Sequence, residues 1–181
     1  MTKFQLLFGI LLLSVFVHEG LYSQCTPPSV VIPDAQHPVD GDEANANCVT
    51  LSYDPAVLGC ATGISMDIEH SYQGDLSLFI NACGNTLNVM QRPGAVGNCA
   101  PGSPYGSGGD IGRGPGNELT VIFEDGGTDP EGGIPVAGGS FGVTADDACG
   151  IGTPGINSFA DLCAACPPGP IDMVICIADH A

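Results

Sequence analysis

Apolar and polar residues alternate at the start of the stretch 64–90. The apolar positions of this first segment are every second residue: Ile64, Met66, Ile68, His70 and Tyr72. A period of two is typical of a half-buried β-strand, because successive side chains of a strand point to opposite faces. A helix would need apolar residues three and four positions apart, whereas those of this first segment are consistently two apart. We therefore predict strands here.

Two glycine-containing turns divide the stretch into three predicted strands. Gln73-Gly74 forms the first turn and Cys83-Gly84-Asn85 the second, since glycine accepts the positive φ of tight turns. The alternation continues through the second strand, with Phe79 out of phase, and resumes at Leu87 and Val89. The pattern predicts a β-meander over residues 64–90.

The remaining composition indicates an all-β chain. It has 27 glycines and 15 prolines, and strand-like runs are separated by turn clusters. Residues 99–116, 126–139 and 149–170 are predicted to be long loops, which in a compact domain bind ligands or are held by cysteines. The nearby cysteines favour the second alternative. Only Ser158–Leu162 suggests a helical turn.

Residues 1–23 are predicted to be a secretory signal peptide. Lys3 supplies the positive start, residues 4–17 are apolar, and small residues follow at Gly20 and Ser23. His18-Glu19 interrupts the run well before the roughly 20 apolar residues of a membrane-spanning helix. We expect residues 24–181 to form one domain that is secreted or attached to the cell surface without membrane insertion.

Nine cysteines follow the predicted signal peptide. They are Cys25, Cys48, Cys60, Cys83, Cys99, Cys149, Cys163, Cys166 and Cys176. In an exported chain they indicate a disulfide framework whose connectivity the sequence leaves open. A zinc site at Cys163-x-x-Cys166 with Cys176 is the less favoured alternative, because no second close cysteine pair or histidine pair accompanies it.

The formal net charge of −17 excludes nucleic acid as a partner. Phosphate binding depends on lysine and arginine, and only Arg92 and Arg113 follow the signal peptide. Such an acidic surface also repels anionic membranes.

The segment from Ile68 to Ile80 resembles the core of the P domain, a jelly-roll β-sandwich of proprotein convertases and of many secreted bacterial proteins. The resemblance rests on His70-x-Tyr72-x-Gly74-Asp75-Leu76, with looser matches at Ile32-Pro33-Asp34, 119–125 and 173–179. It implies a jelly-roll-like antiparallel β-sandwich in which His70, Gly74, Asp75 and Leu76 are structural markers.

Two positions depart from the family pattern. Met173 stands where the family usually has tryptophan, and the sequence ends two residues after Asp179, before the family's final strand. The resemblance therefore implies a sandwich that lacks its last strand. The odd number of cysteines fits this expectation, since four bridges leave one cysteine over, and we expect its partner downstream or, alternatively, in another chain.

The sequence offers no convincing catalytic centre. Gly138 to Gly142 fits the Gly-x-Ser-x-Gly pattern around Ser140, but no convincing helix follows, and His180 is the only histidine downstream. The chain also has no room for a subtilisin-type scaffold. His70, on the apolar face of its strand, is interpreted as a core histidine bonded to backbone or to Asp75, rather than a metal ligand.

Calcium is a candidate ligand for the acidic loops. Asp125, Asp129 and Glu131 lie in one glycine-rich segment, and carboxylate oxygens on flexible loops suit Ca²⁺. The alternative is a solvated acidic surface without bound metal.

Two functions remain after these exclusions. The first is a secreted, non-catalytic P-domain-like sandwich that acts as an interaction or stabilising module, with a protein or a cell-surface component as its partner. The second is an accessory P domain of a subtilisin-like serine endopeptidase whose catalytic domain lies outside this chain.

Overall fold

The computed structural model describes residues 46–68, 70, 73–93, 119–130, 139–144 and 151–179. In chain order the elements are β1 (Asn47–Tyr53), α1 (Pro55–Leu58), β2 (Gly63–Ile68), the 3-10 turn η2 (Gln73–Asp75), β3 (Leu76–Ala82), β4 (Asn85–Gln91), β5 (Leu119–Thr128), β6 (Gly139–Phe141), α2 (Phe159–Ala164) and β7 (Ile171–Asp179). The predicted signal peptide and the Ile32-Pro33-Asp34 motif lie outside the described residues. Within the described ranges, no helix has the length and apolar character needed to cross a membrane.

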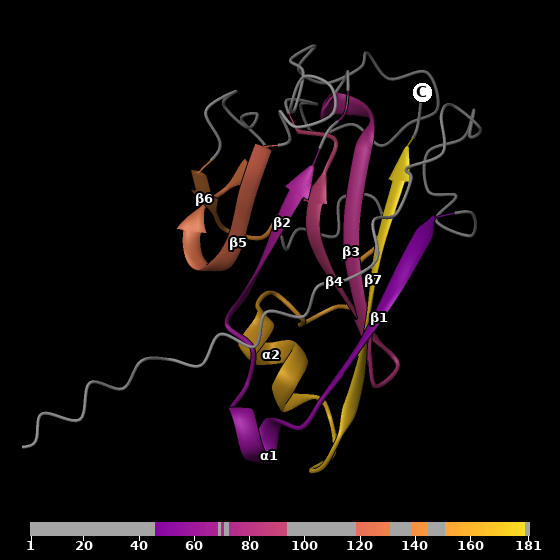
Figure 1. Cartoon of the computed structure of the whole chain (residues 1–181), viewed down its shortest axis with the longest axis vertical. Helices are drawn as coiled ribbons and strands as arrows, with labels where there is room; N and C mark the ends of the chain where they lie inside the picture. Colours follow the sequence, from indigo (N-terminus) through magenta and orange to yellow (C-terminus); the bar gives the residue numbers. More distant parts are fainter. Residues whose placement is uncertain are drawn as a thin grey trace, which may run out of the picture.

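The strands form two sheets, which confirms the all-β sandwich (Figure 1). The larger sheet has the order β1-β7-β3-β4, and every neighbouring pair in it is antiparallel. The smaller sheet has the order β2-β5-β6. Its β2–β5 pair is antiparallel, whereas the short β6 runs parallel to β5, a departure from the purely antiparallel prediction.

The predicted β-meander is wrong in its first connection. β3 and β4 do form a hairpin around Cys83 and Gly84, both of which have positive φ. β2, however, pairs with β5 in the other sheet. Both edges of β3 are occupied, by β4 and by β7, so β2 has no edge of β3 to join. Gln73 and Gly74 accordingly belong to a buried 3-10 turn that crosses between the sheets.

The core lies between the sheets. β3 contributes Leu76, Leu78 and Ile80, β5 contributes Val121 and Phe123, and all five are fully buried or nearly so. The phase break noted at Phe79 coincides with a shift in register between β3 and β4, which is where a β-bulge lets a strand change its pairing. Residues 173–179, one of the looser matches to the family, lie in β7, a central strand between β1 and β3.

α2 confirms the helical turn predicted at residues 158–162. The hydroxyl of Ser158 accepts a hydrogen bond from the backbone N–H of Asp161 at 2.9 Å, which satisfies one of the N–H groups left free at a helix start. Phe159 and Leu162 point into the core from this helix. α2 therefore belongs to the hydrophobic core and helps to close one end of the sandwich.

Candidate functional site

His70 and Asp75 meet partners from distant parts of the chain at one end of the larger sheet. The polar cluster comprises His70, Gln73, Asp75, Arg92 and Asp179. Asp75 ends the 3-10 turn, Arg92 follows β4, and Asp179 ends β7. Pairing of Leu76 with Asp179 brings the start of β3 beside the end of β7, at the upper end of the sheet in Figure 1.

Hydrogen bonds tie this cluster to the sheet. His70 Nε2 lies 3.3 Å from Asp179 Oδ2, and the two side chains are only 11% and 2% exposed. Arg92 Nε donates to the carbonyl of Gly74 at 3.2 Å, and the Arg92 backbone N–H donates to the carbonyl of Leu76 at 2.7 Å. The histidine is therefore a largely buried residue that is bonded to Asp179.

Asp75 is the electrostatically costly member of the cluster. Its side chain is buried, and Oδ1 has no hydrogen-bond partner among the described residues. Burial raises the pKa of Asp75, and the charge of Asp179 raises it further, whereas Arg92 and His70 act in the opposite direction. The folded chain thus favours a protonated Asp75 more than the unfolded chain does.

Arg92 supplies the compensating positive charge. It is the only lysine or arginine within the described ranges, and it is 4% exposed despite its always-charged guanidinium. A buried arginine is tolerated when carboxylates and carbonyls surround it, as Asp75 and Gly74 do here. In the sequence Arg92 stands out only as one of three basic residues, and nothing local indicates that it is buried.

The cluster is better suited to holding strands than to chemistry. A His–Asp pair also occurs in hydrolase triads, but there the histidine must reach a nucleophile that substrate can approach. Here the carboxylates of Asp75 and Asp179 are almost fully buried, as is Arg92. Burial of these groups favours a structural role.

Ser140 does not stand in a nucleophile elbow. It lies within the edge strand β6, with an exposed side chain whose hydroxyl donates to the carboxylate of Glu124 on β5. An elbow places the serine on a sharp turn between a strand and a helix. Gly142 to Thr144, directly after the strand, are not helical. His180, the only downstream histidine, is outside the described residues.

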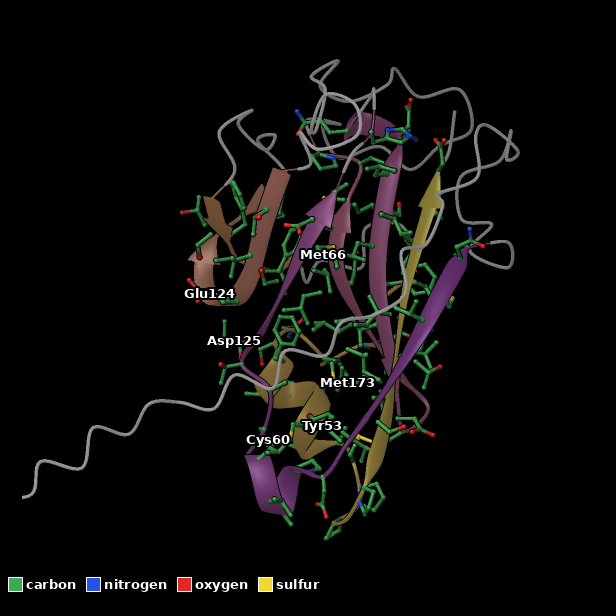
Figure 2. The ribbon with its side chains drawn as sticks, in the orientation of Figure 1. Tyr53, Cys60, Met66, Glu124, Asp125 and Met173 are labelled. Atoms are coloured by element: carbon green, nitrogen blue, oxygen red, sulfur yellow. A yellow bond between two sulfur atoms is a disulfide. The ribbon has the colours of Figure 1, made fainter. Side chains whose placement is uncertain are left out.

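The structure describes two of the three calcium candidates, Asp125 and Asp129. Asp125 caps α2: its two carboxylate oxygens accept hydrogen bonds from the backbone N–H groups of Phe159 and Ala160 at 2.8 and 3.0 Å. Figure 2 shows Asp125 beside this helix. Asp129 is exposed, and Glu131 lies outside the described residues. Within the described ranges, no group of three metal-ligating side chains is found.

Asp125 should therefore stabilise the fold through α2. We expect Asp125→Ala to lower the free energy of unfolding by about 0.5–2 kcal/mol, the range measured for lost helix caps. Urea unfolding with added Ca²⁺ and with a chelator gives the measurement. The same loss is expected in both conditions. A loss that appears only with Ca²⁺ would instead identify Asp125 as a calcium ligand.

Six of the nine cysteines form three disulfides. Cys48 pairs with Cys176, Cys60 with Cys163, and Cys83 with Cys166. Cys163, Cys166 and Cys176 thus belong to three different bridges, so the alternative of a shared zinc site is wrong. Cys25, Cys99 and Cys149 lie outside the described residues.

One bridge lies within a strand pair, and the other two lie around α2. Cys48 and Cys176 face each other across β1 and β7, so their bridge reinforces a ladder that already exists. The other two bridges attach α2 to different places: Cys163 to the segment before β2, and Cys166 to the turn between β3 and β4. With the cap from Asp125 on β5, α2 is fixed to both sheets. The predicted stapling of the 149–170 loop is confirmed at these two positions.

Comparison of the chain with protein-family models, with curated proteins and with solved structures found no match.

Proposed function

We propose that the chain is a secreted, non-catalytic P-domain-like β-sandwich that acts as an interaction or stabilising module. The observation that carries the proposal is the polar cluster. Its motif residues His70 and Asp75 lie with Arg92 and Asp179 in a largely buried group where η2, β3, β4 and β7 meet. Such a group fixes the relative position of strands and leaves little access for a substrate.

The candidates for chemistry support the same proposal. Ser140 lies in a strand without the surroundings of a nucleophile, and Asp125 caps a helix. The disulfides add to this support, because such bridges persist in oxidising compartments outside the cytosol. A stapled scaffold with a buried polar cluster suits a protein whose function lies in its surface.

The proposal is tested by turnover and binding on one preparation of the exported chain. We expect no hydrolysis of peptide or ester substrates by the purified protein, and the same background from Ser140→Ala. Turnover that disappears in Ser140→Ala would overturn the non-catalytic assignment.

A second arm examines the partner. The tagged chain is incubated with proteins exported by its host, after these have reacted with a fluorophosphonate that labels active serine hydrolases. Specific retention of an unlabelled protein supports the interaction module. Retention of a labelled subtilisin-like protease would favour the accessory domain of an endopeptidase. If the chain retains nothing and stabilises no exported protein, the module assignment fails.

A further inference from the structure

One end of the sandwich exposes apolar side chains without charged ones between them. This apolar pole consists of the exposed apolar residues of two segments: Ala56, Val57, Leu58, Ala164, Ala165, Pro167, Pro168 and Pro170. Val57 is 76% exposed and Leu58 59%, and α1 buries none of its residues. The only other large apolar side chain found exposed in the described ranges is Ile122, at 39%.

The two segments of the apolar pole are held side by side at both ends. The bridge from Cys60 to Cys163 joins the end of the first segment to the start of the second. At the other end, β1 pairs with β7 so that Tyr53 lies opposite Ile171, just before α1 and just after Pro170. Figure 1 shows α1 and the chain entering β7 at the same end, opposite the polar cluster. The patch is therefore fixed before any partner arrives.

Charge is excluded from this pole and gathered around it. Residues 55–66 and 162–171 contain no aspartate, glutamate, lysine or arginine, although the chain carries 20 acidic residues. Acidic residues border both segments: Asp54 before the first, and Asp161 and Asp172 on either side of the second. An apolar centre with a charged border is the usual composition of a protein-binding surface.

We propose that the apolar pole docks a protein partner that presents a flat apolar patch bordered by lysine or arginine. This inference rests on the proposed interaction function and adds its location and the chemistry of the partner. The acidic border attracts a basic counterpart and orients it, while the apolar centre supplies the contact. Pre-ordering by the disulfide removes part of the entropy cost of binding.

Other occupants fit this surface less well. A second copy would bring the same acidic border against Asp54 and Asp172, and like charges oppose such a pairing. An anionic membrane surface is repelled for the same reason. A partner that binds extended proline-rich segments is also disfavoured. Gly169 has φ of +118° and turns the chain between Pro168 and Pro170, so these prolines do not form one extended segment.

The test places a photo-cross-linking amino acid, p-benzoylphenylalanine, at Val57 and, as the matched control, at Ile122 on β5. Each full exported chain is irradiated with the exported proteins of its host, and separately with itself and with phosphatidylcholine vesicles. We expect position 57, and not position 122, to cross-link a host protein at a peptide with apolar residues beside lysine or arginine. Asp172→Lys should lower this yield roughly tenfold, as loss of a complementary contact does.

Competition shows that the apolar side chains carry the contact. Excess unlabelled chain should remove the cross-link, and the same excess of the Val57→Ser/Leu58→Ser chain should not. These two residues are exposed, so their replacement leaves the core intact, which is checked by an unchanged unfolding curve.

Several results would overturn the inference. These are cross-linking of position 57 mainly to a second copy or to lipid, cross-linking to a peptide without basic residues, equal capture at both positions, or no capture at position 57. Cross-linking only from position 122 would refute the apolar pole as the docking site, but it would still support the interaction function. Turnover by the purified chain would instead refute the non-catalytic function, whatever position 57 contacts.

Discussion

Reduction of the three disulfides is expected to unfold most of the chain at physiological temperature. Each bridge closes a long loop, with sequence separations of 128, 103 and 83 residues. Removing a native bridge from a small secreted domain costs about 2–5 kcal/mol. Three such losses are comparable with the whole stability of about 5–15 kcal/mol that a domain of this kind has.

Circular dichroism after reduction and alkylation measures this effect, with alkylation of the unreduced protein as the control. The unfolding temperature of the variant Cys60→Ser/Cys163→Ser should lie between those of the reduced and the unreduced protein, because α2 keeps its bridge to the β3–β4 turn. A fully alkylated, reduced chain that still unfolds cooperatively at the same temperature would contradict the assigned role of the bridges.

Replacement of the buried cation is expected to have the second large effect. Arg92→Met keeps an apolar stem in place of the arginine side chain, but it leaves Asp75 without the charge of the guanidinium and the carbonyl of Gly74 without its donor. Removing one partner from a buried group of charges costs about 3–5 kcal/mol. Urea denaturation of the wild type and of the variant at pH 7 gives the difference.

Asp75→Asn provides the matched control. By itself it should leave stability at pH 7 unchanged or higher, because it removes a buried carboxylate that is costly to ionise. Combined with Arg92→Met, it should recover part of the loss, since one unpaired charge is gone. If the change in free energy of unfolding of the double variant equals the sum of the two single changes, Arg92 and Asp75 do not interact.

The raised pKa of Asp75 also fixes the sign of a pH effect. The folded chain holds the Asp75 proton more tightly than the unfolded chain, whose aspartate pKa is near the ordinary 3.8. The resulting contribution to stability is present below that value and is lost as pH rises through the folded pKa. The difference in stability between Asp75→Asn and the wild type should therefore shift in favour of the variant from about pH 4 upward.

The sequence predicted individual strands better than their arrangement. Alternating side chains show which face of a strand is apolar, but the pattern does not say which strand lies alongside. β2 was thus recognised as a strand and placed in the wrong sheet. β1 and α1 were missed although signals existed. Apolar residues alternate through β1, and Asp54-Pro55 is a typical helix start in which the Asp54 carboxylate accepts from the Ala56 N–H.

The candidate site was only partly visible for a related reason. The motif drew attention to His70 and Asp75, but their partners Arg92 and Asp179 are far away in the sequence. Asp125 is a calcium candidate in the sequence because of its glycine-rich acidic segment, whereas its contacts to Phe159 and Ala160 span 34 and 35 residues and leave no local signal. Long-range pairing of this kind, like the connectivity of nine cysteines, follows from the fold and leaves no local signal.

The central claim is that the buried polar cluster around His70 and Asp75 holds the sandwich together and performs no catalysis. The most direct test is urea unfolding of Asp179→Ala beside Asp172→Ala, two aspartates of the same strand. Asp179 is buried against His70, whereas Asp172 is exposed and accepts a hydrogen bond from Ser52. We predict a loss of at least about 2 kcal/mol for Asp179→Ala and of less than about 1 kcal/mol for Asp172→Ala. Equal stability of the two variants, with a hydrolytic activity of the wild type that Asp179→Ala removes, would contradict the claim.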